Sequence, residues 1–278
     1  MTPIVLEVCV DSLHSAEEAV RGGANRLEVC GSLAVGGGAT PSLGLVRAIS
    51  KRYPHIPLMV MVRPRIGDFV YAQSEIEVML EDIGAFKIEG VAGIVLGVLT
   101  CDGDVDVAKT IELVDTARPL EVTFHRAFDM TSDPFKACET IALINGITRI
   151  LTSGHSAPKV PSALPTFAQL QRHLDHCMKN RVLLHPETHI GVATLKLMPG
   201  SGINTDTIAQ VVQALHPIGI NEYHLSAGVF DDSEVSSNSG EGKLEYGMGD
   251  WKVWRTKADI VRDVRLHAED TVDQLRIS

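Results

Sequence analysis

Two copies of the sequence Leu-Glu-Val-Cys bring thiols and carboxylates to a spacing that allows chemistry. The first copy ends at Cys9 and the second at Cys30, and each contains a glutamate, Glu7 or Glu28, two residues before its cysteine. Side chains alternate between the two faces of a β-strand, so each glutamate shares a face with its cysteine. Thiolates are soft metal ligands and nucleophiles, and carboxylates can act as general bases. We therefore expect the thiols and carboxylates to face one interior.

Further polar groups follow the later strand-like segments. Arg63 ends the third segment, and the sequence Thr-Phe-His-Arg-Ala-Phe-Asp at the end of the fifth contains His125 and Asp129. Interior glutamates need partners, because desolvating a carboxylate is costly, and we expect these partners to be Arg63, Arg65 and Arg126. If the protein is an enzyme, the candidate catalytic residues are Glu7, Glu28, Arg63, His125 and Asp129.

Small residues late in the chain predict an anion site. The sequence Gly200-Ser201-Gly202 follows the seventh strand-like segment, and Ser226 ends the eighth. Backbone N–H groups in such turns can converge on a negatively charged group. We expect Gly200, Ser201, Gly202 and Ser226 to bind an anion, although glycines also occur wherever a tight bend needs them.

The elements that must position these groups alternate between strand and helix along the chain. The predicted strands are 4–9, 26–30, 58–63, 93–99, 120–125, 149–152, 195–198 and 222–226. The predicted helices are 12–21, 42–52, 74–87, 106–116, 134–145, 164–179, 205–215 and 257–268. Serines at 12 and 74 resemble helix N-caps. Eight strand–helix units are typical of a (β/α)₈ TIM-type barrel in a single domain, residues 1–278, rather than an open doubly wound sheet.

In such a barrel, the active face lies at the carboxyl ends of the strands. We therefore expect six side chains to point into one barrel: Glu7, Cys9, Glu28, Cys30, His125 and His224. Three segments interrupt the alternation: Gly154–Pro165 as a long loop, His185–Ala193 as an insertion, and residues 228–249 as a mobile loop rich in Ser, Gly and acidic residues.

Composition narrows the classes of partner. The net charge of −10 argues against nucleic acid, which requires a basic surface. The apolar stretches are too short to cross a bilayer, and the N-terminus has no basic region of a secretory signal. Five scattered cysteines suit reduced thiols in the cytoplasm better than disulfides. The oligomeric state is open, and a homo-oligomer is one alternative.

The chain also contains a series of spaced motifs: Glu7 to Ser12, Arg26 to Glu28 with Cys30, Thr40 to Gly44, Arg63-Pro64-Arg65, Gly67 to Phe69, Thr123 to Asp129, Leu151 to Gly154, and His224 with Ser226 and Ala227. Taken together, these motifs resemble the CutC copper homeostasis family. The resemblance covers residues 4–228. It implies a TIM-type barrel in an intracellular protein with a connection to copper tolerance. The two cysteines proposed to hold copper in that family correspond to Cys9 and Cys30.

Two functions are compatible with these observations. In the first, the protein handles copper, and Cys9 and Cys30 bind one Cu(I) at the barrel mouth. In the second, a TIM-barrel enzyme acts on a small anionic or phosphorylated substrate, with Glu7 or Glu28 as general base, His125 as acid or electrophile, and Arg63 as part of an anion clamp. A third possibility, a catalytically inert scaffold, would not explain why polar and charged side chains face the interior.

Overall fold

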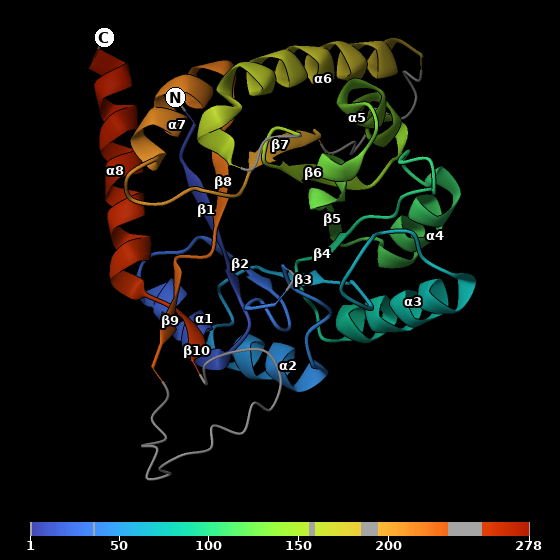
Figure 1. The fold of residues 1–278 in the computed structure, drawn as a ribbon, viewed down its shortest axis with the longest axis horizontal. Coiled ribbons are helices and arrows are strands. Elements are labelled where there is room, and N and C mark those ends of the chain that lie inside the picture. The colour runs from blue at the N-terminus through green and yellow to red at the C-terminus, as the bar shows by residue number, and fades with distance from the viewer. Residues whose placement is uncertain (1, 36, 156–158, 185–193, 233–251, 278) are drawn as a thin grey trace, which may run out of the picture.

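Eight parallel strands form a barrel in the computed structural model, which describes residues 2–35, 37–155, 159–184, 194–232 and 252–277 (Figure 1). The strands are β1 (Val5–Val10), β2 (Arg26–Val29), β3 (Leu58–Met61), β4 (Gly93–Leu96), β5 (Glu121–Phe124), β6 (Ile147–Thr152), β7 (Lys196–Pro199) and β8 (Glu222–Leu225). Their order in the sheet is β7-β6-β5-β4-β3-β2-β1-β8. A parallel bridge between Gly200 and His224 joins the two edge strands, so the sheet closes on itself.

Helices surround the barrel and alternate with the strands along the chain (Figure 1). They are α1 (Leu13–Arg21), α2 (Leu43–Arg52), α3 (Gln73–Ile88), α4 (Val107–Ala117), α5 (Pro134–Leu143), α6 (Leu164–Leu184), α7 (Ile208–Leu215) and α8 (Ala258–Ile277). This arrangement confirms the predicted TIM-type barrel. Within the described ranges, no helix combines the length and apolar character needed to cross a membrane.

One of the two predicted serine caps is present. The Ser12 side chain accepts a hydrogen bond from the N–H of Ser15, as expected at the start of α1. The expectation for Ser74 is wrong, because α3 begins at Gln73. Ser74 is therefore the second residue of the helix, and Ala72 occupies the cap position. The carboxylate of Glu75 instead accepts a hydrogen bond from the N–H of Ala72, the residue before the helix, at 2.7 Å. A carboxylate in the first turn therefore satisfies the free backbone donor there.

The two faces of the strands have different surroundings. Leu6 and Val8 of β1 belong to the large apolar core between the barrel and the helices. Cys9 lies on the other face of β1 and packs in a separate small cluster inside the barrel, with Cys30, Met59, Met61 and Val95. The predicted alternation is therefore confirmed, and chemistry-bearing residues of the first two strands lie in the barrel interior.

The structure corrects two of the three predicted loops. Residues Gly228–Asp231 form a strand, β9, that pairs antiparallel with β10 (Val253–Thr256) beside the barrel, although the sequence predicts a mobile loop from residue 228. In the loop predicted at 154–165, Val160–Ser162 form a short 3₁₀ helix. The predicted insertion at 185–193 and residues 233–249 of the predicted mobile loop lie outside the described residues.

Candidate functional site

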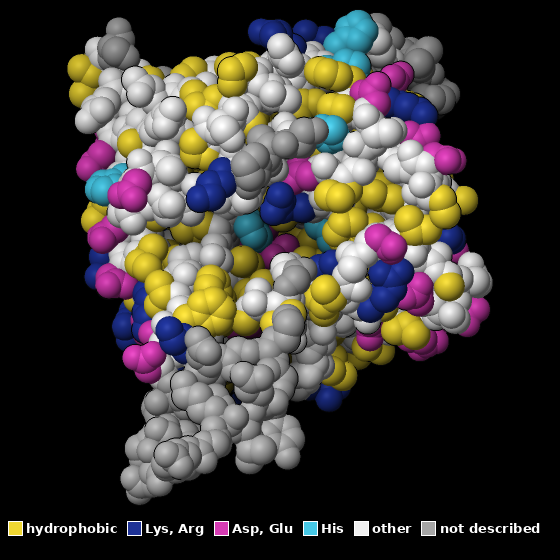
Figure 2. All heavy atoms as spheres, viewed as in Figure 1, with side chains coloured by type: hydrophobic (Ala, Val, Ile, Leu, Met, Phe, Trp, Pro, Cys, Tyr) yellow, Lys and Arg dark blue, Asp and Glu magenta, His cyan; other side chains and the backbone are white. Residues whose placement is uncertain are grey.

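The carboxyl ends of the strands surround a cavity of about 470 Å³, here named the mouth cavity. Figure 2 shows the hollow near the centre of the face, with histidine, acidic and basic side chains in and around it. The predicted site residues that line it are Cys9, Glu28, Arg63, His125, Asp129, Ser201, Gly202 and Ser226, together with His224. Glu7, Cys30 and Gly200 are not among the lining residues. The structure therefore brings most of the predicted residues together.

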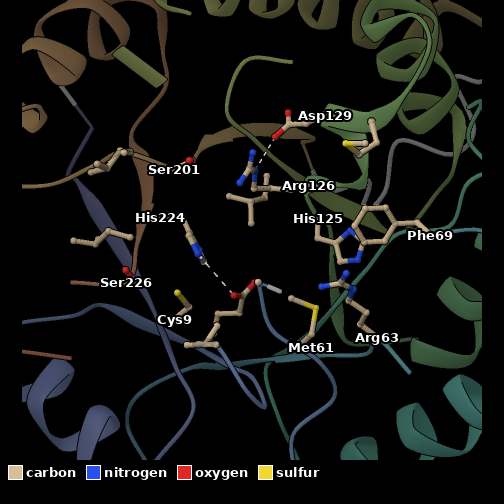
Figure 3. Close-up of a pocket in the computed structure, with 18 of the residues that line it drawn as sticks. Cys9, Met61, Arg63, Phe69, His125, Arg126, Asp129, Ser201, His224 and Ser226 are labelled. Atoms are coloured by element: carbon tan, nitrogen blue, oxygen red, sulfur yellow. Dashed lines mark hydrogen bonds and ion pairs between the residues drawn. The ribbon is translucent and has the colours of Figure 1, made fainter. Parts of the chain in front are cut away.

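Cys9, Glu28 and His224 form a compact group of ligand atoms at this cavity. Figure 3 shows two of them, Cys9 and His224, on one side of the cavity. The Sγ of Cys9, a carboxylate oxygen of Glu28 and a ring nitrogen of His224 all lie within 4.8 Å of one another. All three residues are buried. Cys9 and Glu28 are direct neighbours on β1 and β2, and β8 supplies His224 from the other side of β1. A thiol, an imidazole and a carboxyl at such distances can hold a metal ion.

Cys30 lies outside this compact group because of the strand register. The residue opposite Cys9 on β2 is Glu28, and Cys30 follows two residues later along the barrel axis. Its buried thiol donates a hydrogen bond to a carboxylate oxygen of Glu28 at 3.3 Å. The stagger between neighbouring strands is a requirement of barrel closure. The two cysteines are therefore linked through Glu28 and do not face each other directly.

Two methionines that sequence reasoning missed join the cysteines inside the barrel. Met59 and Met61 of β3 are buried against Cys9 and Cys30, and Met61 also lines the mouth cavity. A Cβ atom at Gly93 would lie 2.3 Å from Cε of Met59, so the glycine provides the space for that side chain. The period-2 alternation of β3 predicts that the two methionines share a face, which is the signal that could have found them.

Glu7 lies deeper in the barrel and orients His224. One carboxylate oxygen is 2.8 Å from Nδ1 of His224, and the other accepts a hydrogen bond from Nε of Arg26 at 2.5 Å. Burial alone would raise the pKa of Glu7, but Arg26 and His224 outweigh it and lower the pKa to about 2. An ionised Glu7 favours the proton of His224 on Nδ1, which directs Nε2 toward Cys9 and Glu28.

A network of ion pairs continues from Arg26 toward the amino-terminal end of the barrel. Arg26 donates a hydrogen bond to Glu222 at 2.8 Å, and Arg149 and Lys196 contact the same carboxylate at 2.6 and 2.7 Å. Although burial raises the pKa of Glu222, the two arginines lower it to about 2. The predicted partners of the glutamates were Arg63, Arg65 and Arg126, so this prediction is wrong for Glu7, whose arginine partner comes from β2.

Burial also controls the protonation of the possible ligands. It raises the pKa of Cys9 and, with help from the adjacent Glu28 carboxylate, raises that of Cys30 well above the ordinary value. It raises the pKa of Glu28 as well. For His224, burial lowers the pKa, but the nearby Glu28 and Cys9 outweigh burial. The pKa of His224 is therefore well above its ordinary value. Without a metal, the two thiols and His224 therefore retain protons that a metal ion would displace.

His125 lies on the side of the cavity opposite this group, next to Phe69 and Arg63 (Figure 3). Its Nδ1 accepts a hydrogen bond from the N–H of Ala127 at 3.2 Å, which leaves the ring proton on Nε2. Burial, followed by the charge of Arg63, lowers the pKa of His125 to about 3, so the ring is neutral at pH 7. A Cβ atom at Gly97 would lie 2.5 Å from Nδ1, so the glycine makes room for the ring.

Asp129 and Gly200 have local structural partners. Asp129 accepts hydrogen bonds from the hydroxyl of Thr152 and from the N–H and hydroxyl of Ser153, and it forms an ion pair with Arg126 at 2.8 Å. The N–H of Gly200 donates a hydrogen bond to the carbonyl of Thr152 at 2.8 Å. The amide of Gly200 is thus engaged within the barrel, whereas Ser201 and Gly202 reach the cavity.

Comparisons with known proteins identify the family. Residues 4–229 match the model of the CutC family. The chain is 41% identical to the copper homeostasis protein cutC homolog of Mus musculus, over 94% of this chain and 90% of that protein. It is also 41% identical to the Homo sapiens homolog, over 82% of this chain and 75% of that protein.

Among solved structures, the chain is similar to a copper homeostasis protein CutC from Streptococcus agalactiae. The TM-score is 0.68 and the sequence identity 26%, with 80% of this chain and 98% of that chain covered. The shared fold and the relatives named above point to the same family as the sequence motifs, several of which contribute residues to the mouth cavity. The chain therefore belongs to the CutC family.

Proposed function

We propose that this protein takes part in copper homeostasis by binding Cu(I) in the mouth cavity, with Cys9 and His224 as ligands and Cys30 as the second thiolate. The relatives named as copper homeostasis proteins support the first part of the proposal. The observation that carries the second part is that ligand atoms of Cys9 and His224 lie within 4.8 Å of each other, with Cys30 packed in the same interior cluster as Cys9. A thiolate and an imidazole are both ligands that suit copper.

The surroundings favour the monovalent ion. Met59 and Met61 place two thioether groups beside the cysteines, and soft sulfur donors select Cu(I) over harder metals. Glu28 is a hard oxygen donor, so we assign it a different role, as the group that accepts the proton leaving the thiol of Cys30 at 3.3 Å. All five cysteines are free, which suits a reducing compartment, and we expect the protein to act in the cytosol.

The alternative is that the two cysteines only fill space in the barrel, because buried thiols often behave as small apolar groups. Competition for Cu(I) against a chelator separates the two interpretations. The variants Cys9→Ser and Cys30→Ser should lose affinity, and Cys101→Ser provides the control because that cysteine is exposed. X-ray absorption of the copper complex should show sulfur and nitrogen neighbours.

Each single variant should weaken Cu(I) binding by about tenfold or more, whereas Cys101→Ser should bind as the wild type does. A loss confined to Cys9→Ser would show that Cys9 and His224 suffice. If Cys9→Ser and Cys30→Ser both remain folded and keep the stoichiometry and affinity of the wild type, the copper proposal is wrong.

A further inference from the structure

The mouth cavity is much larger than a copper site requires. Its volume is about 470 Å³, whereas a single water molecule occupies roughly 30 Å³ in the liquid. A copper ion held between Cys9 and His224 would take up only one side of this space. Cavities of about 300–1,000 Å³ are typical of small-molecule sites. The remaining volume therefore matches an organic ligand of modest size.

Positive charge lies on the side of the cavity away from Cys9. Arg63 follows β3, Arg126 follows β5, and both guanidinium groups belong to lining residues. Arg126 is half exposed and pairs with Asp129, while Arg63 is buried beside His125. The charge of Arg63 contributes to the lowered pKa of His125, so protonation of the ring is disfavoured at this place. The same field favours a negatively charged group of a ligand.

His125 supplies a neutral hydrogen-bond donor on this side. Its Nε2 has no hydrogen-bond partner among the described residues, and the side chain is buried. An unpaired buried donor is unfavourable, so a partner that arrives with a ligand would relieve that cost. Phe69 packs against the His125 ring, with the ring centroids 4.8 Å apart, and provides an apolar surface next to the donor.

From this juxtaposition we infer that the β3–β5 side of the mouth cavity binds a small organic oxyanion, a carboxylate or a phosphate ester. Arg63 and Arg126 face its charge, the Nε2–H of His125 donates to one of its oxygens, and its apolar part lies against Phe69 and Met61 (Figure 3). This site does not require copper, so it goes beyond the function proposed above and can be tested on the metal-free protein.

The test is a calorimetric titration of the metal-free protein with three probes of similar shape. Benzoate and phenyl phosphate carry the two kinds of oxyanion, and benzamide is their neutral counterpart. We expect saturable binding of at least one anion, about tenfold or more tighter than benzamide, and weaker at high salt. The stronger of the two anions identifies the kind of oxyanion preferred.

Two pairs of variants locate the site. Arg126→Gln should weaken anion binding by about threefold or more, because it removes one charge at the cavity. The matched control is Arg118→Gln: both arginines pair with an aspartate three residues away, at 2.8 and 2.9 Å, and their side chains are 46% and 47% exposed. Arg118 is not a cavity residue, and its variant should bind the anion as the wild type does.

At position 125, the substitution to Asn keeps an acceptor near the N–H of Ala127 but removes the donor at the place of Nε2, whereas Gln can retain that donor. His125→Asn should therefore weaken anion binding more than His125→Gln does. Cu(I) binding by both variants should remain, which separates this site from the copper site. The inference is overturned if neither anion binds saturably up to about 20 mM, if benzamide binds as well as the anions, or if Arg126→Gln and Arg118→Gln behave alike.

Discussion

The substitution Glu7→Gln tests whether this carboxylate determines the state of His224. Glu7 is fully buried, and each of its oxygens has one partner, Nδ1 of His224 at 2.8 Å and Nε of Arg26 at 2.5 Å. Glutamine keeps the shape but has only one accepting oxygen. Arg26 is always a donor, so the amide oxygen should turn toward it. The amide NH₂ group then faces Nδ1 of His224.

An NH₂ group beside Nδ1 favours the His224 tautomer that carries its proton on Nε2. That is the nitrogen near Cys9 and Glu28, so the lone pair available to copper is lost. We expect the Cu(I) affinity to fall about 10–100-fold, as is typical when the partner of a ligating histidine is removed. We also expect the free energy of unfolding to fall by about 3–5 kcal/mol, because the variant breaks a buried ion pair. A domain stable by about 5–15 kcal/mol can remain folded after this loss.

Three measurements check this reasoning. Nitrogen-15 NMR of the protein after addition of Cu(I) reports which imidazole nitrogen of His224 carries the proton, chelator competition reports Cu(I) affinity, and urea unfolding reports stability. Glu269→Gln is the control, because Glu269 is a half-exposed partner of Arg265 at 2.8 Å on α8. Its loss should cost no more than about 1 kcal/mol and leave Cu(I) binding unchanged. If a folded Glu7→Gln variant keeps the proton on Nδ1 and the wild-type Cu(I) affinity, Glu7 does not orient His224.

Other substitutions test the charge network, the packing of His125 and the thioether groups. The pKa of Glu222 is lowered from 4.5 to about 2, so its ion pairs stabilise the fold above pH 4.5 and this stability is lost as the pH falls toward 2. Glu222→Gln should therefore lower the free energy of unfolding at pH 7 by about 3 kcal/mol and flatten its dependence on acid pH, as measured by urea unfolding between pH 2 and 7. Gly97→Ala would put a Cβ atom 2.5 Å from Nδ1 of His125, so it should cost about 1–3 kcal/mol and shift the NMR signals of that ring. Met61→Leu should weaken Cu(I) binding in chelator competition with a change in stability below about 1.5 kcal/mol, and an unchanged affinity would show that the thioether is not a ligand.

Local patterns in the sequence were enough to predict the barrel and the direction of its first side chains. Alternating strand and helix segments require a crossover after every strand, and eight such units close most simply as a barrel. Leu6 and Val8 face the helices while Glu7 and Cys9 face the interior, because successive residues of any strand point to opposite faces. The same rule, applied to β3, would have identified the two interior methionines.

Contacts between distant segments depended on the tertiary structure. Glu7 and His224 are 217 residues apart, and they meet because β8 returns to pair with β1. The register between β1 and β2 places Glu28 opposite Cys9, so Cys30 lies two residues beyond, a relation that no repeat in the sequence reveals. The β9–β10 ribbon likewise depends on pairing across residues 232–252.

The difference between what the sequence predicts and what depends on the tertiary structure has a simple physical cause. The face of a strand on which a side chain lies follows from bond geometry within a few residues, so sequence alone determines it. The neighbour of that side chain depends on strand stagger and on where the barrel closes, and these are set by packing over the whole chain. The amino-acid sequence therefore determined that thiols and carboxylates enter the barrel. Only the tertiary structure decided that Cys9 meets His224 and that Glu28 lies between the two cysteines.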